Sequence, residues 1–480
     1  MTERAGVVVA AGADGRRSTT AAGRAVLAAA LRPVDPDGAR AVEGAEDWRK
    51  DYPAHFRRLV EAGLRSPEDW VHLAGAGLDE LDHRMRIGLT GGDEAPLTAA
   101  LAEPATRKPG TEEVRGSGER EAELVLPYRG ELLRGDGIRR RVESWIAGGI
   151  AEPSLAGPID AVLAHPEWLR LDGVTVAALG AGAEMAPVAP LLRWGATVAA
   201  VDLPRPALQD RLRAAAAGSA GRLLLPTDGD AAGTGGRTGG QTGADLLTEV
   251  PAIADWLTGL PGRLVLGTYA YADGSLHLRL SAAADVLGRR VRQQRADLAL
   301  AYLATPTDVF AVPGAAVTAA TTAYERSAAR RLGAVTPLFH RPYEPGTDPG
   351  INDSLIPQQG PNYALAKRVQ RWRATVARAA GATVSFHVAP STRTRSVVSR
   401  RTLKAAFTGA HHFGVEVFEP ATSSTLLAAL LVHDLNTTPP VHAHPWQDEA
   451  YTAVHGGLWR TTYAPRSVFP LAALLGLRPR

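Results

Sequence analysis

A tyrosine and a lysine four residues apart, Tyr363 and Lys367, are the most chemically suggestive pair in this chain of 480 residues. The surrounding pattern, Asn-Tyr-Ala-Leu-Ala-Lys followed by an amphipathic stretch, predicts a helix. A spacing of four places both side chains on one face of that helix. An ammonium group close to a phenol stabilises the phenolate and lowers the pKa of the tyrosine. Such a tyrosine can exchange a proton with a hydroxyl or carbonyl oxygen.

The scarcity of lysine makes this pair more informative. The 53 basic residues include only four lysines, Lys50, Lys108, Lys367 and Lys404. Arginine would serve on a solvated helix face, whereas lysine supplies a compact point charge beside a phenol. We therefore interpret Lys367 as a chemical partner of Tyr363. The alternative is an amphipathic helix that carries the two residues by chance.

A glycine turn lies upstream of this pair. The sequence predicts a strand at 174–179, the turn Gly-Ala-Gly at 180–182, a helix at about 185–194 and a strand at 197–201 that ends in Asp202. Glycines let the backbone approach a diphosphate, and a helix that starts at the turn offers it free N–H groups and a positive dipole end. The separation of Gly180 and Asp202, 202 − 180 = 22 residues, is close to the roughly 20 expected before a ribose-binding carboxylate.

The turn leaves the identity of the ligand open. Asp202 favours NAD over NADP, because a carboxylate accepts hydrogen bonds from ribose hydroxyls and repels a 2′-phosphate. Arg205, three residues later, can offset that repulsion, so NADP stays possible. The third glycine of the dinucleotide fingerprint is replaced by Met185. S-adenosylmethionine-dependent methyltransferases use a similar turn and acid, and a strand–helix turn without a ligand also fits the pattern.

Together, the glycine turn and the Tyr363-x-x-x-Lys367 motif resemble the short-chain dehydrogenase/reductase family. The resemblance covers about residues 172–435 and implies an NAD(P)-dependent oxidoreductase that transfers hydride between nicotinamide and a carbonyl or alcohol substrate. The resemblance implies that Tyr363 is the catalytic acid/base. Lys367 then lowers the pKa of Tyr363 and holds the nicotinamide ribose. Ser354, nine residues before the tyrosine, is the candidate for the serine that polarises the substrate.

The same resemblance assigns residues to the cofactor. Gly267 and Thr268 occupy the place where the family has Asn-Ala-Gly after its fourth strand. A predicted strand at 382–389 leads into Pro390 and Thr394, which are similar to the family's loop that reaches the nicotinamide carboxamide. The complete set of expected cofactor-binding residues is Gly180, Gly182, Asp202, Gly267, Thr268, Pro390 and Thr394.

The order of the predicted elements indicates an α/β protein. Helices alternate with strands at 174–179, 197–201, 222–226, 263–271 and near 309–312, which predicts a doubly wound, mostly parallel, Rossmann-like sheet. Ser66 and Pro67 predict the start of a helix in a small helical N-terminal unit. That unit keeps open a cofactor-binding regulatory or scaffold protein without turnover. The expected organisation is a poorly ordered 1–45, a helical unit 46–102, a linker 103–121, a helical lead-in 122–170, a Rossmann-like domain 171–435 with a flexible insertion at 227–243, and a C-terminal tail 436–480.

Composition narrows the choice of function and surroundings. The net charge of +3, without a dense basic run, argues against nucleic acid as a partner. The absence of cysteine excludes disulfides and thiolate metal sites, and His433, His442 and His444 lack the spacing of a metal-binding motif. There is no apolar run of about 18 residues and no signal-peptide pattern, so we expect a cytoplasmic protein without a membrane span. We expect a small-molecule substrate and no metal, and a homo-oligomer stays an open alternative.

Overall fold

The computed structural model describes residues 6–89, 93–228 and 241–477. Its centre is a seven-stranded sheet in which six neighbouring strands are parallel, as expected for a mostly parallel α/β protein. The strand order is β14 (Val384–Val388), β11 (Ala299–Ala304), β10 (Arg263–Thr268), β7 (Val174–Leu179), β8 (Thr197–Val201), β9 (Arg222–Thr227) and β4 (Gly110–Arg115).

The sheet is apolar on both faces because its side chains alternate between two hydrophobic cores. Along β7, Ala177 and Leu179 belong to one core, whereas Val176 and Ala178 belong to the other. A strand that is buried on both sides is expected to be an uninterrupted apolar run. The predicted strands at 174–179, 197–201 and 222–226 have this character and are confirmed almost to the residue.

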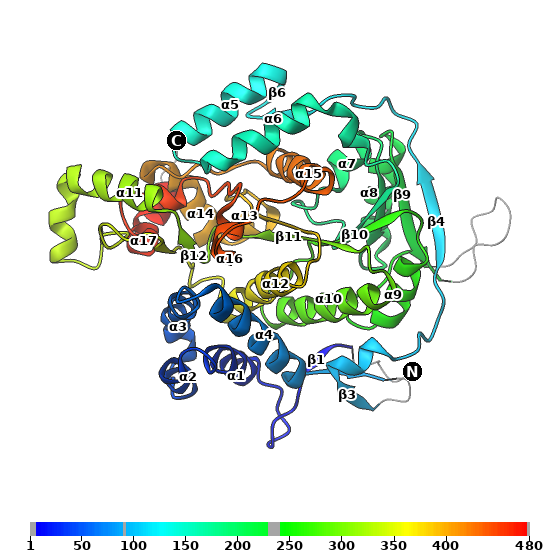
Figure 1. The fold of residues 1–480 in the computed structure, drawn as a ribbon, viewed down its shortest axis with the longest axis horizontal. Helices are drawn as coiled ribbons and strands as arrows, with labels where there is room; N and C mark the ends of the chain where they lie inside the picture. Colours follow the sequence, from blue (N-terminus) through cyan, green and yellow to red (C-terminus); the bar gives the residue numbers. More distant parts are fainter. Residues whose placement is uncertain (1–5, 90–92, 229–240, 478–480) are drawn as a thin grey trace.

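Two layers of helices cover the sheet, one on each face (Figure 1). One core includes α9 (Val250–Thr258), α10 (Ser275–Gln294) and α12 (Pro361–Ala379). The other includes α5 (Gly135–Ala147), α6 (Ala156–Ala164), α7 (Val188–Arg193), α8 (Pro206–Ala217) and α15 (Pro420–Asn436).

The N-terminal helices belong to the first of these cores. They are α1 (Thr19–Leu31), α2 (Pro36–Glu43), α3 (Trp48–Gly63) and α4 (Pro67–Arg84). Ser66 caps α4 as predicted, since its side chain accepts a hydrogen bond from the amide of Asp69 at 3.0 Å. The expectation of poor order for 1–45 is wrong for 19–43. The alanine-rich composition that suggested it is also a good helix former, and α1 buries its apolar face against α4 and α12.

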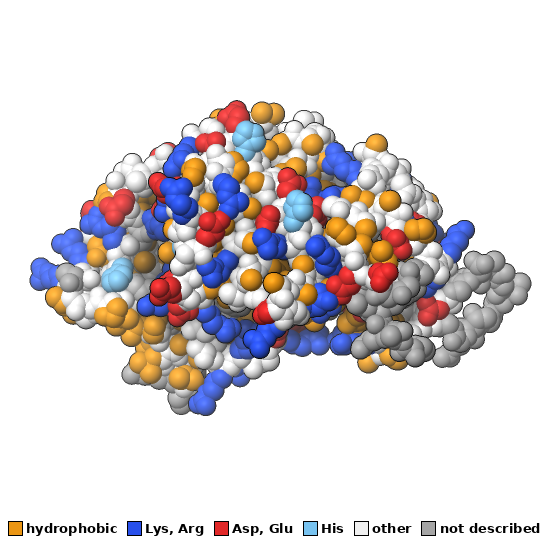
Figure 2. All heavy atoms as spheres, turned by 90° about the horizontal axis from the view of Figure 1, so that it is seen from below, with side chains coloured by type: hydrophobic (Ala, Val, Ile, Leu, Met, Phe, Trp, Pro, Cys, Tyr) orange, Lys and Arg blue, Asp and Glu red, His pale blue; other side chains and the backbone are white. Residues whose placement is uncertain are grey.

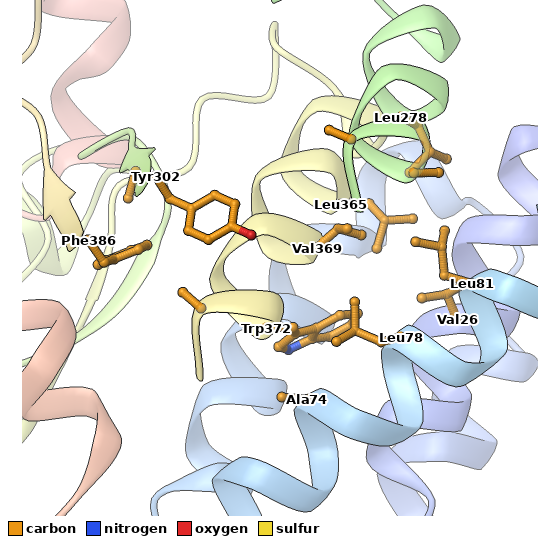
Figure 3. Close-up of a cluster of buried hydrophobic side chains, with 14 of the residues drawn as sticks. Val26, Ala74, Leu78, Leu81, Leu278, Tyr302, Leu365, Val369, Trp372 and Phe386 are labelled. Carbon is orange, nitrogen blue, oxygen red and sulfur yellow. The ribbon is translucent and has the colours of Figure 1, made fainter. Parts of the chain in front are cut away.

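Helix α12 lies between these N-terminal helices and the sheet (Figure 3). Trp372 of α12 packs among Ala74 and Leu78 of α4 (Figure 3), and a β-carbon added to Gly77 would lie 2.4 Å from its ring. The helical unit is therefore packed directly against the helix that carries Tyr363.

The segments before the Rossmann-like part also differ from the prediction. The expected linker 103–121 contains β4, which pairs antiparallel with β9 at the sheet edge (Figure 1). The expected helical lead-in begins with the hairpin of β5 (Val125–Tyr128) and β6 (Glu131–Arg134). A separate three-stranded sheet is formed by β1 (Val8–Val9), β2 (Met85–Gly88) and β3 (Glu94–Pro96).

The fifth parallel strand is β11, not the strand expected near 309–312. The stretch Ala-Leu-Ala-Tyr-Leu-Ala of β11 has no β-branched residue, so its sequence carries only a weak strand signal. A strand does form at β12 (Val309–Val312), but it pairs antiparallel with β13 (Gly350–Asp353) outside the main sheet. The long connection from β11 to α12 also contains α11 (Gly314–Arg326) and the 3₁₀ helix η4 (Ala328–Ala334).

The C-terminal elements are α13 (Arg395–Val398), α14 (Arg401–Gly409), α16 (Pro445–Ala450) and α17 (Pro465–Gly476), and α17 packs against α14. Most of the insertion expected at 227–243 lies outside the described residues, namely 229–240. Its described ends meet at a bridge between Thr227 and Thr242. In the described part of the chain, no helix is both long and apolar enough to cross a membrane. Basic and acidic side chains are interspersed on the face seen in Figure 2.

Candidate active site

A cavity of about 900 Å³ lies at the carboxyl ends of the parallel strands. Its walls come from the segments that follow β7, β8, β10, β11 and β14, and from one face of α12. In α/β sheets, ligands bind at this edge, where the strand order changes direction. Eight of the ten predicted site residues line this cavity: Gly180, Gly182, Asp202, Thr268, Tyr363, Lys367, Pro390 and Thr394.

The glycine turn requires glycine at its first position. Gly180 has φ = 80°, which is a left-handed conformation, and a β-carbon there would lie 2.4 Å from the Cα of Ala270. Ala270 follows β10, so the loops after β7 and β10 meet at this turn. A β-carbon on Gly182 would lie 2.3 Å from a methyl group of Leu208, on α8. The absence of a side chain at these two glycines therefore lets the backbone of the turn lie close to Ala270 and to Leu208 of α8.

Asp202 holds the turn from the end of β8. One carboxylate oxygen accepts a hydrogen bond from the amide of Gly182 at 2.8 Å, and the other accepts one from the amide of Leu203 at 2.8 Å. Asp202 and Arg205 both line the cavity.

The helix after the turn is shorter and begins later than predicted. Helix α7 has six residues and starts at Val188, so no helix N-terminus adjoins Gly182. Pro187 explains the late start, because the residue before a proline is disfavoured in the helical conformation. The expected contribution of a helix dipole to diphosphate binding is therefore not provided by α7.

Tyr363 and Lys367 lie on the face of α12 that borders the cavity. The Tyr363 ring makes edge-on contacts with His277 and Tyr271, at centroid distances of 5.3 and 6.1 Å. Burial raises the pKa of Tyr363, and a hydrogen bond with Thr305 opposes the shift. This corrects the expectation that the tyrosine pKa is lowered toward neutrality.

The two hydrogen-bond acceptors of Lys367 are neutral. Its Nζ donates to the carbonyl oxygen of Leu303 at 3.2 Å and to Oε1 of Gln370 at 3.3 Å. Burial lowers the pKa of Lys367 to about 8. His277 is fully buried beside Tyr363, and burial together with the charge of Lys367 lowers the pKa of His277 to about 3. A neutral imidazole therefore lies against the Tyr363 ring.

A buried ion-pair network anchors α12. Arg371 donates to Oδ2 of Asp308 at 2.7 Å and to Oε1 of Glu449 at 3.0 Å, and Arg368 donates to Oδ1 of Asp308 at 3.2 Å. The two arginines hold the pKa of Asp308 below its usual range despite complete burial. Because Asp308 follows β11 and Glu449 belongs to α16, the network fixes the helix of Tyr363 against both elements.

Ser354 does not lie in the Tyr363 cavity. Its side chain is buried, and its hydroxyl donates a hydrogen bond to Oδ1 of Asn352. The amide group of Asn352 in turn donates to the hydroxyl of Tyr343 at 2.9 Å. Ser354 lines a second cavity instead. Gly267 also lies outside the first cavity, where a β-carbon would be 2.3 Å from the ring of Tyr269.

Thr305 is the hydroxyl that the sequence analysis missed. It follows directly after β11, lines the cavity and contacts the Tyr363 hydroxyl. Its Oγ1 is 2.8 Å from Oγ1 of Thr307, which donates to Oε1 of Gln359 at 3.1 Å. The signal that could have found Thr305 is its place at the end of a parallel strand.

The remaining predicted residues lie after β14 or in the C-terminal segment. Pro390 and Thr394 border the cavity, and Thr394 forms the N-terminal end of α13. His442 Nδ1 is 2.7 Å from a carboxylate oxygen of Asp448, and the side chain of His444 caps α16. In the described part of the chain, no three histidine or acidic side chains gather as a metal site would require.

Comparison with known proteins gives a distant structural resemblance. No protein-family model and no curated protein matches the chain. Solved structures that it resembles include a doubly substituted short-chain dehydrogenase/reductase from Serratia marcescens, at 15% identity and a TM-score of 0.33, over 60% of this chain and 98% of that one. It also resembles A-type ketoreductases from a modular polyketide synthase, at 18% identity and a TM-score of 0.29, over 55% of this chain and 46% of that one. A thiolation-reductase di-domain from an archaeal non-ribosomal peptide synthetase matches at 14% identity and a TM-score of 0.29, over 58% of this chain and 59% of that one. The chain thus has a distant structural resemblance to short-chain dehydrogenase/reductases.

Proposed function

We propose that this protein is an NAD(P)-dependent oxidoreductase that transfers hydride between nicotinamide and a carbonyl or alcohol group. The observation that carries the proposal is the meeting of Tyr363 and Lys367 with the glycine turn and Asp202 in one cavity. These residues come from three separate parts of the chain, namely the segment after β7, the end of β8 and α12. The strand order changes direction between β7 and β10, which supports a doubly wound sheet with its ligand site at this edge.

The residues that line the cavity suit a dinucleotide. Its volume of about 900 Å³ lies at the upper end of the roughly 300–1,000 Å³ typical of ligand sites. The backbone at Gly180 and Gly182 would face the diphosphate, and Asp202 would accept from the ribose hydroxyls. Lys367 has only neutral acceptors in this structure, so its ammonium group can also bind ribose hydroxyls. Thr268, Pro390 and Thr394 would border the nicotinamide.

The side chains around Tyr363 suit proton donation. When bound, nicotinamide supplies or accepts the hydride. The raised pKa of Tyr363 keeps the phenol protonated, so the phenol is present as the acid that would donate a proton to a carbonyl oxygen during reduction. We propose that Thr305, rather than Ser354, polarises that oxygen, because its hydroxyl already contacts the Tyr363 hydroxyl.

Substitution of these hydroxyls tests the mechanism. Tyr363→Phe is expected to lower kcat by roughly 10²–10⁴-fold, the usual contribution of general acid–base catalysis. Thr305→Val should also lower kcat, whereas Ser354→Ala should leave it close to wild type. Tyr324→Phe, outside the cavity, is the matched control for Tyr363→Phe. Near-normal turnover by Tyr363→Phe with any carbonyl substrate would refute the assignment.

Ligand titration separates this proposal from its alternatives. NADH, NADPH and S-adenosylmethionine would each be titrated calorimetrically into the protein. A reductase should bind NADH or NADPH. If Asp202 selects NAD, Asp202→Asn should lower the affinity for NADH more than the affinity for NADPH. Binding of S-adenosylmethionine alone would support a methyltransferase. Cofactor binding that is unaffected by Tyr363→Phe, with no turnover of any carbonyl by the wild type, would support a regulatory protein.

A further inference from the structure

A second cavity of about 530 Å³ adjoins the first, and the two share the lining residues Thr307, Ser391 and Phe407. Because three residues border both spaces, no more than one layer of side chains separates them. The walls of the second cavity come from the connection between β11 and α12, from α14 and from the segment that contains α17. These elements meet beside the Tyr363 site.

The lining of the second cavity is predominantly apolar. The apolar side chains include those of Leu355, Ile356, Ala406, Phe407, Phe413, Val415, Leu458, Val468 and Phe469. Such a surface binds a ligand chiefly by removing hydrocarbon from water.

Several polar groups in this wall are already bonded to protein. The Ser354 hydroxyl donates to Asn352, and the Ser467 hydroxyl donates to the carbonyl oxygen of Ala464 at 2.8 Å. Asp353 accepts from Arg466 at 2.8 Å. A polar ligand would therefore find few unsatisfied partners in this wall, and its own polar groups would lose hydrogen bonds to water on entry.

The cavity points toward the reacting groups at one end and toward solvent at the other. Thr307 and Ser391, at the junction, are buried, and Thr307 is one hydrogen bond from Thr305. Arg341 and Arg466, by contrast, are exposed and mark the outer end. A carbonyl group placed at Tyr363 would thus direct its attached chain through the junction.

We infer that the second cavity binds the aliphatic chain of a linear aldehyde, ketone or alcohol whose reacting carbon lies at Tyr363. This rests on the proposed function for the reaction itself. If a methylene group takes about the volume of a water molecule, roughly 30 Å³, the cavity of about 530 Å³ holds a chain of roughly a dozen carbons with room for bends.

Chain length is the first test. Each buried methylene contributes about 0.8 kcal/mol, so kcat/KM for linear aldehydes should rise about fourfold per added carbon. The rise should begin once the chain passes the junction and level off when the cavity is full, which by the same volume argument is at most roughly 18 carbons. A flat profile from propanal to dodecanal would overturn the inference.

Two tryptophan variants on α17 locate the effect. Val468 lines the cavity and is buried, whereas Leu474 on the same helix is exposed. Val468→Trp should remove the rise of kcat/KM with aldehyde chain length. Leu474→Trp should retain the wild-type profile. Retention of the long-chain preference in a folded Val468→Trp protein would overturn the inference.

A binding measurement separates this inference from the proposed reaction. Calorimetric titration of 1-decanol needs no turnover and can be made on wild type, Tyr363→Phe and Val468→Trp. Decanol binding that Tyr363→Phe keeps and Val468→Trp loses would support the cavity even if no aldehyde were reduced, in which case only the proposed reaction fails. Turnover of short aldehydes without any decanol binding would overturn the cavity assignment alone. Should Val468→Trp fail to fold, the wild-type length profile and decanol affinity still decide.

Discussion

Replacement of Lys367 by methionine is expected to stabilise the fold at neutral pH while it removes activity. The ammonium group of Lys367 is held by two neutral acceptors, the carbonyl oxygen of Leu303 and the side chain of Gln370. Burial disfavours the charged form and lowers the pKa of Lys367 from 10.5 to about 8, and the charge of Asp308 only partly opposes this shift. Methionine has a similar length and no charge, so it avoids this cost.

The pKa difference sets the size and sign of the effect. One pKa unit corresponds to 1.36 kcal/mol, so the buried charge costs about 3 kcal/mol below pH 8. Loss of the hydrogen bonds of Lys367 offsets about 1 kcal/mol of the gain, which leaves the variant about 2 kcal/mol more stable at pH 7. Between about pH 8 and 10.5, the unfolded chain binds more protons at Lys367 than the folded one, so wild-type stability rises with pH. By pH 10 this gain is about 2.5 kcal/mol, and the advantage of the variant has disappeared.

Urea unfolding of wild type and Lys367→Met at pH 7, 8, 9 and 10 measures this difference directly. Subtraction of the two curves removes the titration of groups that both proteins share. Lys50→Met, at an exposed position on α3, should show no comparable pH-dependent difference from wild type. A wild-type minus Lys367→Met difference that stays constant from pH 7 to 10 would refute the buried-charge explanation. An opposite slope would show that Lys367 has an anionic partner in the folded protein.

Three further substitutions test the packing around the cavity. Gly77→Ala should destabilise the protein by about 1–3 kcal/mol in urea unfolding, because its β-carbon would lie 2.4 Å from the ring of Trp372. Arg371→Met should cost about 3–5 kcal/mol by the same assay, since it removes the arginine that pairs with the buried Glu449 carboxylate and leaves Asp308 with Arg368. Gly180→Ala should lower the melting temperature and weaken NAD(P)H binding, because a left-handed residue would press its methyl group against Ala270.

Each of these variants has a nearby control. Gly75→Ala, on the same helix as Gly77, adds a methyl group to open space and should stabilise by about 0.5–1 kcal/mol. Arg378→Met removes a half-buried ion pair from the helix of Arg371 and should cost less than about 1 kcal/mol. Gly173→Ala has a similar positive φ to Gly180 but meets no neighbouring atom, so it should not affect ligand binding. Equal effects within any pair would contradict the packing explanation for that pair.

The sequence pattern predicted what depends on local periodicity. The glycine turn, Asp202 and the Tyr363/Lys367 helix were predictable because each lies in a short stretch with its own strand or helix signal. Thr305 was not, since its strand is an alanine- and leucine-rich run that also reads as helix. The separation of Thr305 and Tyr363, 363 − 305 = 58 residues, further hides their contact, because a long connection with its own helix and strands lies between them.

The electrostatic state of the site depends on residues that no local pattern links. Tyr271 and His277 reach the Tyr363 ring from the segment after β10, and they surround it with aromatic groups instead of charge. Burial therefore raises the pKa of the phenol and lowers that of Lys367, so both side chains move toward their neutral forms. Any negative charge that enters the cavity near Lys367 reverses part of this shift, because it favours the ammonium form. The pair is thus sensitive to what occupies the cavity, and a spacing of four residues on a helix sets only its geometry.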